Sequence, residues 1–524
     1  MPIHISFKGL YFAFLILMVL SLPFSTFGLS VAQFGLLGTW IIEGILHGNP
    51  RKTITKLLSS KPALVLVSFF LLHLLGLLYT TDWGYALKDI RIKLPLLLLP
   101  VIFVTSQKLR NHNIDLLLSI YITSILTATF ISLGILLTKE VNDFRELSPF
   151  ISHIRLSLNV CLAFFFALHL AFQKYRQAKI LQVLLIGMAV WFMAFLVMIE
   201  SLTGLIILFS AGFLLTFYGI FHFGSKLLRL GSIAVLFLVP VGIGFYLYSS
   251  AYSFLTPDKH HIENHDLFTS QGNPYLHDTN SSLVEHGRYI GVYICEEELR
   301  EEWKKRSAYD YDGLDEKKQK LRFTLFRYLN SKGLRKDADG LRQLGHKDIR
   351  NVELGIANIY YTRKFSVNSR LHKIFWEYQI IRENINPGGH SLIQRLEYWK
   401  AALDIIRNHV LFGVGTGDIK QAFADHYEAT NSPLEMQFRH RAHNQYLATT
   451  VTFGILGLFL FLFSLFYPGI WLKKIFTYRY FVFLITLLIS MLVEDTLETQ
   501  MGVTLFAFFN TMLLFGPHEI EKTG

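Results

Sequence analysis

Long runs of apolar residues, separated by short polar links, dominate the pattern along the chain. A helix needs about 20 mostly apolar residues to cross the roughly 30 Å hydrocarbon core of a bilayer. The apolar runs lie at residues 10–27, 29–46, 63–79, 94–104, 114–137, 154–172, 180–199, 202–221, 232–248, 446–467, 480–493 and 503–515. They predict an all-α polytopic membrane protein with about twelve transmembrane helices. The run 94–104 is short, so we expect it either to be extended by the amphipathic stretch before it or to be partly re-entrant.

One long polar segment interrupts the apolar runs and divides the chain into three expected parts. Residues 1–248 are expected to form an N-terminal transmembrane block of about nine helices, residues 249–441 a large loop, and residues 442–524 a C-terminal block of about three helices. The second half of the loop places apolar residues at helical spacing, for example Leu371, Phe375 and Tyr378. We therefore expect a folded, helical loop rather than a flexible tether.

Basic residues in the short links predict the orientation in the membrane. With a cytoplasmic N-terminus, five links without Asp or Glu fall inside, and they contain Arg51, Lys52, Lys56, Lys61, Lys108, Arg110, Lys174, Arg176, Lys179, Lys226, Arg229, Lys473, Lys474 and Arg479. Because short cytoplasmic links retain Lys and Arg, both termini are expected inside and the large loop outside. The first apolar run has no cleavage site and is expected to remain attached. Lys88, Arg91 and Lys93 fall on the outer side, against this rule, and an anionic ligand is one reason for them to be there.

Composition supports a membrane protein rather than a nucleic-acid-binding one. Of the 524 residues, 52% are hydrophobic, and the formal net charge is +11. Outside the loop the basic residues lie mostly in the short links, so the positive charge indicates topology and no nucleic acid partner is expected. Cys161 lies in an apolar run and Cys295 in the polar loop, so a disulfide between them is not expected.

Three short motifs make the segment 395–457 the most informative part of the chain. They are an Arg-x-x-x-Trp sequence from Arg395, a Gly-Val-Gly turn that ends at Gly415, and a His-Asn-x-x-Leu sequence that begins at His443 and opens the next apolar run. In order and spacing they resemble the O-antigen ligase and O-antigen polymerase superfamily of bacterial membrane glycosyltransferases. The stretches 285–303 and 493–509 resemble the Bacteroidetes-type members of that superfamily.

The resemblance implies a fold, a location and a reaction. Members have a GT-C-like helical membrane fold and transfer a glycan from an undecaprenyl-diphosphate carrier at the periplasmic face of the bacterial inner membrane. The acceptor is lipid A-core for a ligase and a second carrier-linked glycan for a polymerase. No cofactor, nucleotide sugar or metal ion is implied.

Arg395 and Trp399 lie one helical turn apart, so both side chains can share one face of a helix. The guanidinium fork of Arg395 matches phosphate oxygens and is expected to hold the diphosphate leaving group, with Trp399 in the substrate site. In the structural alternative, Arg395 pairs with Glu397 or Asp404 at the surface.

His443 stands where the polar loop meets an apolar helix, and the resemblance assigns it the role of general base. A neutral imidazole there can accept the proton of an acceptor hydroxyl as that hydroxyl attacks the anomeric carbon. The alternative is a histidine that only bonds to backbone at the start of a helix. Arg441, in the basic cluster 439–441, either engages phosphate or anchors the chain at the membrane surface.

The glycine turn around Gly415 superficially resembles a dinucleotide fingerprint, but no strand precedes it and no parallel sheet is available. We expect the turn to break the helix, with Asp418 as N-cap of the next one. Its backbone amides are also candidate phosphate donors, and the two roles are compatible.

Ionisable residues near the ends of apolar runs are further candidates, because charges at membrane depth are costly and tend to be functional. Arg155 is the second expected diphosphate ligand. Many family members carry an arginine after the serine at the outer edge of the corresponding helix pair, but here Leu202 occupies that place after Glu200 and Ser201. Arg155 or Arg91 is expected to compensate for the missing arginine.

Acidic and histidine clusters complete the set of candidates. Glu494 and Glu498 lie one turn apart with Asp495 between them, and they either orient an arginine or cap helix ends. The histidines at 260, 261 and 265 lack a convincing fourth ligand, so no metal site is expected.

The rival class is a transporter or lipid-glycan flippase, which would use the intramembrane charges as a pathway. The two halves of the chain contain no clear pair of broken helices, and much of the chain is an ordered outside loop, which favours the enzyme.

Overall fold

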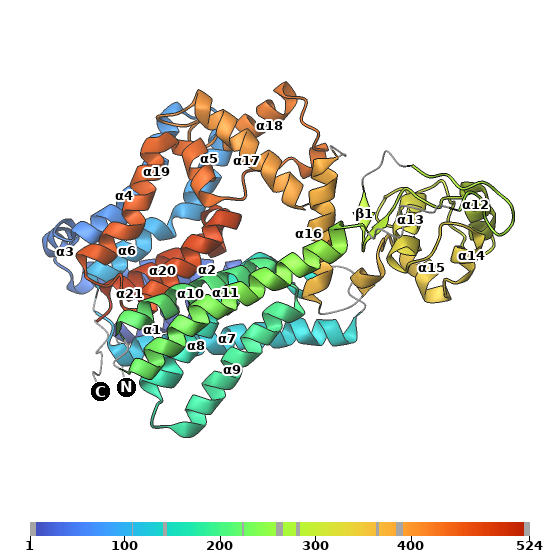
Figure 1. Cartoon of the computed structure of the whole chain (residues 1–524). Helices are drawn as coiled ribbons and strands as arrows, with labels where there is room; N and C mark the ends of the chain where they lie inside the picture. Colours follow the sequence, from blue (N-terminus) through green and yellow to red (C-terminus); the bar gives the residue numbers. More distant parts are fainter. Residues whose placement is uncertain are drawn as a thin grey trace. The chain divides into compact units, whose positions relative to one another are not determined.

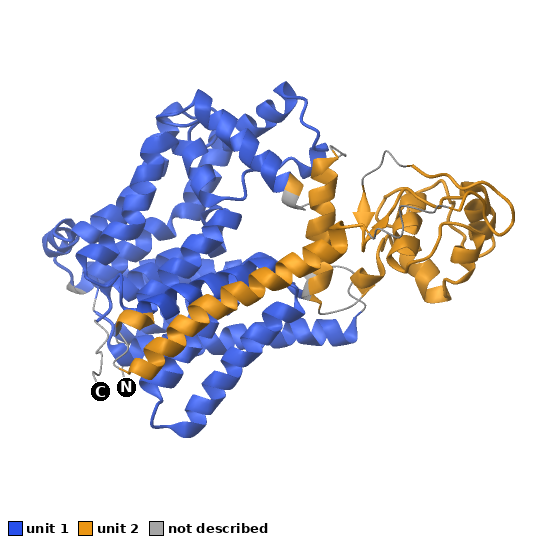
Figure 2. Ribbon diagram, viewed as in Figure 1, with its two compact units in different colours: residues 1–218, 394–524 blue, residues 219–393 orange. Residues whose placement is uncertain are grey.

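The structure, a computed structural model, describes residues 7–106, 108–139, 144–222, 225–257, 266–278, 283–362, 366–383 and 391–517. These residues form mainly helices, together with one antiparallel pair of two-residue strands. The chain forms two compact units, coloured separately in Figure 2: unit 1 contains residues 1–218 and 394–524, and unit 2 contains residues 219–393. Helices α10 (Leu202–His222) and α17 (Ser391–Asn408) cross the boundaries between the units.

Unit 1 combines helices from both ends of the chain (Figure 1). Its N-terminal part contains α1 (Phe7–Ser21), α2 (Thr26–His47), α3 (Pro50–Leu58), α4 (Lys61–Leu75), η1 (Gly76–Tyr79), α5 (Trp83–Lys93), α6 (Pro95–Thr105), α7 (Asn111–Thr138), η2 (Phe144–Leu147), α8 (His153–His169), η3 (Leu170–Lys174), α9 (Lys179–Met198) and most of α10. Its C-terminal part contains most of α17, then α18 (Ile419–Ala429), η6 (Met436–Phe438), α19 (Gln445–Trp471), α20 (Tyr478–Val493), η7 (Thr496–Glu498) and α21 (Gln500–Phe515).

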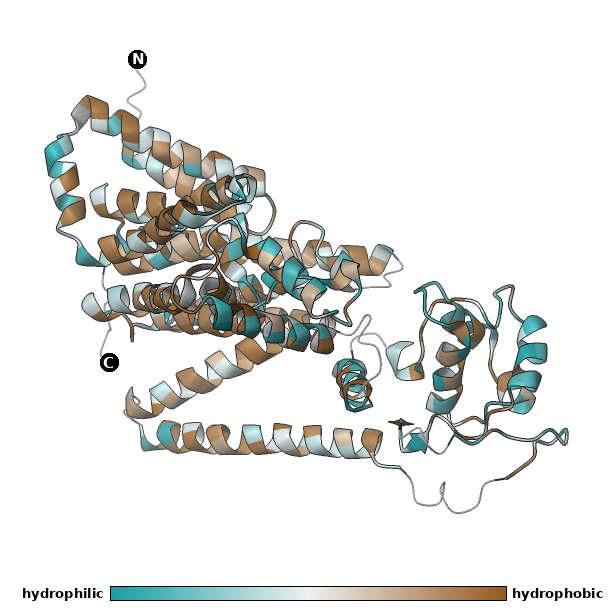
Figure 3. Ribbon diagram, turned by 90° about the horizontal axis from the view of Figure 1, so that it is seen from above, coloured by the Kyte–Doolittle hydropathy of each residue, from teal (hydrophilic) through white to brown (hydrophobic). Residues whose placement is uncertain are grey.

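Every predicted apolar run lies mainly in helices, although not every such helix is long enough to cross a membrane. Among the described residues, eight helices are long and apolar enough to do so: α2, α4 with η1, α7, α8 with η3, α9, α10, α11 (Lys226–Leu255) and α19. Helices α1, α20 and α21 are shorter and apolar. Figure 3 shows apolar residues along most of the length of these helices. The helical, polytopic membrane architecture is confirmed, while the count of about twelve spans stays a prediction.

A proline accounts for one place where an apolar run and the helices differ, and a second run is as short in the structure as in the sequence. The first run was expected to reach residue 27, but α1 ends at Ser21 before Pro23, and Ser25 caps α2 by accepting from the N–H of Gly28. The short run became α6, which has 11 residues and contains Pro100. At about 1.5 Å per residue, α6 covers roughly half the hydrocarbon core.

Two basic residues expected in a cytoplasmic link also tie the helices of unit 1 together. Arg479 donates to the carboxylate of Asp115 and to Nε2 of His169, each at 2.7 Å, and so joins α20 to α7 and α8. The ammonium group of Lys474 donates to the carbonyl oxygen of Leu513 at 3.0 Å. The last carbonyls of a helix lack partners within the helix, so Lys474 stabilises the end of α21.

Helix α19 is broken at Gly454, whose φ is +66°, and a loop from the preceding segment fills the break. The N–H of Ile455 donates to the carbonyl of Val410 at 2.8 Å, and the N–H of Gly415 donates to the carbonyl of Thr452 at 2.9 Å. Backbone groups released by the break therefore have partners, as the interior of a membrane protein requires.

Replacing Gly454 with alanine is expected to destabilise the protein by about 3 kcal/mol, because a side chain there adopts a left-handed backbone conformation and meets the facing loop. A Cβ at this position would lie 2.2 Å from the carbonyl oxygen of Leu411. Thermal unfolding of the purified protein in detergent measures the change. Gly134→Ala is the control: Gly134 lies within α7 with nothing within 4 Å of its added Cβ, and alanine there is expected to be neutral or to stabilise by up to about 1 kcal/mol. Equal melting temperatures for the two variants would contradict this account of the break.

Unit 2 contains α11 followed by a small lobe. The elements of the lobe are β1 (Val284–Glu285), β2 (Arg288–Tyr289), α12 (Glu296–Lys304), α13 (Leu321–Ser331), α14 (Ala338–Arg342), α15 (His346–Glu353), η5 (Ile359–Thr362) and α16 (Val367–Arg382). Its core includes the fully buried Trp303 and Tyr328. A buried ion pair joins Glu285 to Arg327 at 2.9 Å, and the guanidinium of Arg327 lies 3.6 Å from the ring centroid of Trp376.

The helical character expected for the second half of the loop is present, although the buried face of α16 differs from the predicted stripe. Leu371, Trp376 and Ile380 are buried, whereas Tyr378, predicted to lie on the buried stripe, is 51% exposed. The division at residues 248 and 441 stays a prediction.

Candidate active site

His443 lies in unit 1, two residues before the start of α19, with a backbone φ of +46°. The next residue, Asn444, caps α19: its side-chain oxygen accepts from the N–H of Leu447 at 3.1 Å. The amide group of Asn444 donates to the carbonyl of Leu492 at 3.0 Å, which ties the start of α19 to the end of α20. The His-Asn-x-x-Leu motif therefore fixes His443 at the mouth of a span through a helix cap.

Two aromatic residues of α17 hold the segment that leads into His443. The indole N–H of Trp399 donates to the carbonyl of Ala442 at 3.0 Å, and the hydroxyl of Tyr398 donates to the carbonyl of Phe438 at 2.6 Å. The ring centroid of Tyr398 lies 5.7 Å from that of His443. The structure thus brings Trp399 to the site, but as a support for the backbone next to His443.

Two buried carboxylates face the imidazole of His443. Nδ1 lies 3.8 Å from Oε2 of Glu494 and 3.7 Å from Oδ1 of Asp495. Both carboxylates are 7% exposed, and the side chain of His443 is 35% exposed. The ring therefore stands at the edge of the protein with one nitrogen toward the acidic pair.

Arg441 lies in the same cluster and is bound on three sides. Its guanidinium bonds to the hydroxyl of Tyr85 at 2.9 Å, to Glu498 at 3.1 Å and to Asp495 at 3.1 Å. Glu498 also accepts from the ammonium group of Lys93 at 2.9 Å. Of the two roles left open for the acidic residues, the structure supports the orientation of arginines.

Lys93 is the one residue of the unexplained outer basic group that is buried, at 1% exposure, while Lys88 and Arg91 are exposed. Its ion pairs with Glu498 and with Asp89, at 3.5 Å, give it an internal role. The exception that Lys93 makes to the expected distribution of basic residues is therefore explained by its buried ion pairs.

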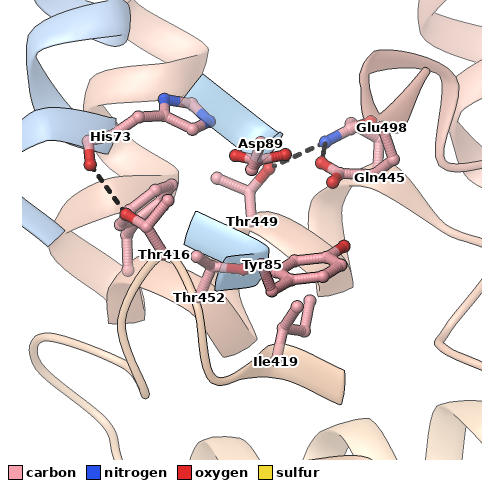
Figure 4. Close-up of a pocket in the computed structure, with 10 residues that line it drawn as sticks. His73, Tyr85, Asp89, Thr416, Ile419, Gln445, Thr449, Thr452 and Glu498 are labelled. Carbon is pink, nitrogen blue, oxygen red and sulfur yellow. Dashed lines mark hydrogen bonds between the residues drawn. The ribbon is translucent and has the colours of Figure 1, made fainter. Parts of the chain in front are cut away.

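A small polar cavity adjoins the network (Figure 4). It is lined by His73, Tyr85, Asp89, Thr416, Ile419, Gln445, Thr449, Thr452, Phe453 and Glu498. Gln445 donates to Glu498 at 3.3 Å, and its carbonyl oxygen accepts from the N–H of Leu497 at 2.7 Å. Tyr85 and Gln445 were missed by the sequence analysis, because Tyr85 lies outside the motifs and Gln445 occupies an unspecified position of the His-Asn-x-x-Leu motif.

Arg155 and Arg395 complete the positive side of the site. Arg155, in the first turn of α8, pairs with Oε1 of Glu494 at 3.3 Å. Its Nε is buried without a hydrogen-bond partner among the described residues. Arg395, on α17, lies close enough that its charge lowers the pKa values of His443 and Glu494. Four of the predicted site residues therefore surround or support His443.

The protonation of the site favours a neutral imidazole. Burial, aided by the positive charges of Arg395 and Arg441 and opposed by Asp495, lowers the pKa of His443 below its usual value. Burial also raises the pKa of Glu494 to about 7, with the neighbouring charge of Asp495 adding to the effect. At neutral pH, His443 is therefore in the form that accepts a proton.

The glycine turn lies elsewhere, and its amides are already used. The N–H of Gly415 donates to Thr452 in the break of α19, and the N–H of Gly417 donates to the hydroxyl of Thr80 at 2.7 Å. A Cβ on Gly417 would lie 2.2 Å from the carbonyl oxygen of Asp82. These contacts give the turn a packing role, while the substrate-binding role of Gly415 stays a prediction that the function proposed below does not use.

Asp418 was expected to cap α18, but its carboxylate makes no cap bond there. Instead it accepts from the backbone N–H groups of Thr81 and Asp82, each at 2.8 Å, at the start of α5. Burial tends to raise the pKa of Asp418, but these donors outweigh burial and lower it.

Asp418→Asn is expected to lower the free energy of unfolding by about 1 kcal/mol at pH 7, since charged hydrogen bonds at the start of α5 are weakened. Because the pKa is lower in the folded state, this contribution is present above the unfolded value near 4 and is lost as the pH falls through the folded pKa. Unfolding measured between pH 3 and pH 7 should show the two proteins converging in acid. Asp425→Asn, at an exposed site on α18, should stay within about 0.5 kcal/mol throughout. A gap between Asp418→Asn and the native protein that does not shrink in acid would contradict the assignment.

His443, Glu494 and Asp495 are, among the described residues, the group whose potential ligand atoms could hold a metal ion, within 4.8 Å of one another. Each carboxylate already pairs with a guanidinium, Glu494 with Arg155 and Asp495 with Arg441. These arginines disfavour a further cation, so the residues do not fit a metal centre well. The histidines at 260, 261 and 265 lie outside the described residues.

Comparison with known proteins gives one family match. Residues 356–462 match the family Wzy_C, described as O-Antigen ligase. The matched range contains Arg395, Trp399, Gly415, Arg441 and His443, whereas Arg155 and the acidic pair lie outside it. No curated protein matches the chain. The protein is thus a polytopic membrane protein in which residues 356–462 are similar to the O-antigen ligase domain.

Proposed function

We propose that the protein is a glycosyltransferase that moves a glycan from undecaprenyl diphosphate to lipid A-core at the periplasmic face of the bacterial inner membrane. The observation that carries the proposal is that His443 faces Glu494 and Asp495, whose carboxylates pair with the guanidinium groups of Arg155 and Arg441, while the charge of Arg395 acts on the imidazole. A proton acceptor next to groups that bind phosphate matches the needs of transfer from a diphosphate carrier. The match over residues 356–462 and the resemblance to Bacteroidetes-type members support the same class.

In the proposed reaction, Arg395 and Arg155 bind the carrier diphosphate. His443 accepts the proton of the acceptor hydroxyl, whose oxygen forms a bond to the anomeric carbon. The bond between that carbon and the diphosphate oxygen breaks, and undecaprenyl diphosphate leaves with the electron pair. Attack opposite the leaving group inverts the anomeric centre. Neither a metal ion nor a nucleotide sugar takes part in the proposed reaction.

Arg155 is proposed to take the place of the family arginine that is absent at Leu202. The hydroxyl groups of Ser157 and Ser201 lie 2.7 Å apart, so the start of α8 adjoins the start of α10. Arg155 lies two residues, about half a helical turn, before Ser157, the residue of α8 that contacts Ser201 next to Leu202. Its buried Nε, which has no hydrogen-bond partner within the described part of the chain, is a donor for a phosphate oxygen. Arg91 is exposed and is not needed in this proposal.

The proposed topology has about twelve membrane segments, with both termini in the cytoplasm and the 249–441 segment in the periplasm. The charge pattern of the links supports it. In this orientation, the ends of α20 and the beginnings of α8 and α19 face the periplasm, where the lipid-linked donor would be presented.

A polymerase is the second candidate, since it uses the same donor chemistry and a second carrier-linked glycan as acceptor. A flippase is less well supported. An imidazole beside an acidic pair is suited to proton transfer, whereas a flippase needs a path for the lipid-linked glycan across the membrane.

Transfer in proteoliposomes tests the proposal. A labelled carrier-linked glycan is supplied with lipid A-core or with unlabelled donor alone, and Arg395→Ala is compared with Arg407→Ala. Arg407 lies on the same helix, is 77% exposed and pairs with Asp404. A ligase gives labelled lipid A-core that Arg395→Ala loses and Arg407→Ala keeps. Longer carrier-linked chains would identify a polymerase, and relocation of unaltered donor would identify a flippase.

A further inference from the structure

The two carboxylates beside His443 are arranged in the same way relative to the ring. Asp495 directs Oδ1 to the imidazole and Oδ2 to Arg441, and Glu494 directs Oε2 to the imidazole and Oε1 to Arg155. Each carboxylate therefore connects the ring to a different arginine. Such a connection fixes the direction of the carboxylate oxygens that face the imidazole.

We propose that Asp495 is the positioning residue of His443 and holds the imidazole with Nε2 toward the acceptor hydroxyl, while Glu494 links the same ring to the donor-binding Arg155. The inference rests on the proposed function and adds to it a role for residues outside the matched range.

The geometry around the ring supports this assignment. Nδ1 lies 3.7 Å from Asp495, slightly beyond a hydrogen bond, and a small ring rotation brings the two atoms into bonding distance. Catalytic hydrogen bonds are often long before substrate binds and shorten afterwards. With Nδ1–H directed to the buried carboxylates, Nε2 is the nitrogen left to accept the proton.

The electrostatics favour Asp495 over Glu494 as the positioning residue, because burial raises the pKa of Glu494 to about 7. The groups that face His443 are Arg395 and Tyr398 from α17, His440 and Arg441 from the preceding segment, and Glu494 and Asp495 from the end of α20. The negative charge of Asp495 raises the pKa of His443 and opposes the arginines. The carboxylate therefore stabilises the imidazolium that forms when His443 takes the proton.

Glu498 offers a matched control within the same network. It holds Arg441 at 3.1 Å, as Asp495 does, but within the described part of the chain the ion pairs of His443 are with Glu494 and Asp495 and not with Glu498. A change at Glu498 disturbs Arg441 without removing the charge next to the imidazole.

The test is the pH dependence of kcat for Asp495→Asn, Asp495→Glu and Glu498→Gln in proteoliposomes, with folding checked by thermal unfolding. Asp495→Asn is expected to lower kcat about 10- to 100-fold, less than the loss of the base itself, with the donor KM nearly unchanged. Removing the charge lowers the pKa of His443, so the acid limb of the kcat profile should move to lower pH by about one unit. Asp495→Glu should restore part of kcat, and Glu498→Gln should leave the acid limb in place.

Three results would overturn the inference. A loss of kcat in Asp495→Asn without movement of the acid limb would mean that Asp495 acts only through Arg441. Loss of native activity in EDTA and its return with Mn²⁺ would make the acidic pair metal ligands. Full transfer by His443→Ala would refute the general-base role on which the inference rests, whereas the absence of any transfer by the native protein would contradict the proposed function itself.

Discussion

Replacing His443 with alanine is expected to lower kcat for glycan transfer by about 10²- to 10⁴-fold, the usual contribution of a general base. The neutral imidazole at the mouth of α19 is the group beside the arginine cluster that is suited to accept a proton at neutral pH. Donor binding should change little, because Arg155 and Arg395 remain in place. Single-turnover transfer from labelled donor measures the rate of the chemical step, and equilibrium binding measures the affinity for the donor.

The backbone conformation of His443 calls for a second variant. Its φ of +46° is left-handed, which alanine tolerates less well than histidine or asparagine. His443→Asn keeps a side chain suited to this conformation and removes the base, so it should lose transfer as His443→Ala does. The exposed His409→Ala, at the end of α17, should retain native activity. Transfer at the native rate by a well-folded His443→Asn would refute the general-base role.

Local patterns predicted the helices well and their ends less well. The apolar runs located every described helix that is long and apolar enough to cross a membrane, since an apolar stretch of this length has few alternatives in a membrane. The early end of α1 follows from Pro23 inside an apolar run, whose effect a hydropathy pattern does not register.

The candidate site was predictable where a motif specified it and not where distant residues completed it. Trp399 and His443 belong to two separate motifs, and Trp399 bonds to Ala442, the residue before His443. The role of Trp399 depends on the direction of its indole N–H, which the motif does not specify. Asp418 has the residue type and place of a local N-cap, yet its partners lie 336 or more residues away. Lys93 and Glu498 are separated by 405 positions, so no local pattern pairs them.

Gly415 shows how one pattern can fit two structures. A glycine-rich turn before a helix suits both phosphate binding and close backbone packing. The partners of the amides decide between the two, and here they are carbonyl and hydroxyl oxygens of the protein. Sequence spacing contains no information on the direction of those N–H groups.

Glu498→Ala is expected to be the most destabilising single change in the network, by about 3 kcal/mol, because it leaves a buried lysine with too little negative charge. Lys93 is 1% exposed and bonds to Glu498 at 2.9 Å, while its other partner, Asp89, is farther away at 3.5 Å. Arg441 also loses one of its two carboxylates. Thermal unfolding in detergent should show a large drop in melting temperature, and transfer should fall as Arg441 is released toward solvent.

Glu498→Gln separates the charge from the packing. The amide keeps the shape of the side chain and an oxygen that accepts from Lys93, so its loss of stability should be smaller than that of the alanine variant. The order of melting temperatures should therefore be native, then Glu498→Gln, then Glu498→Ala. If Glu498→Ala melted with the native protein, Lys93 and Arg441 would not depend on Glu498, and the buried network would not be what holds α5 against the start of α19 and the end of α20.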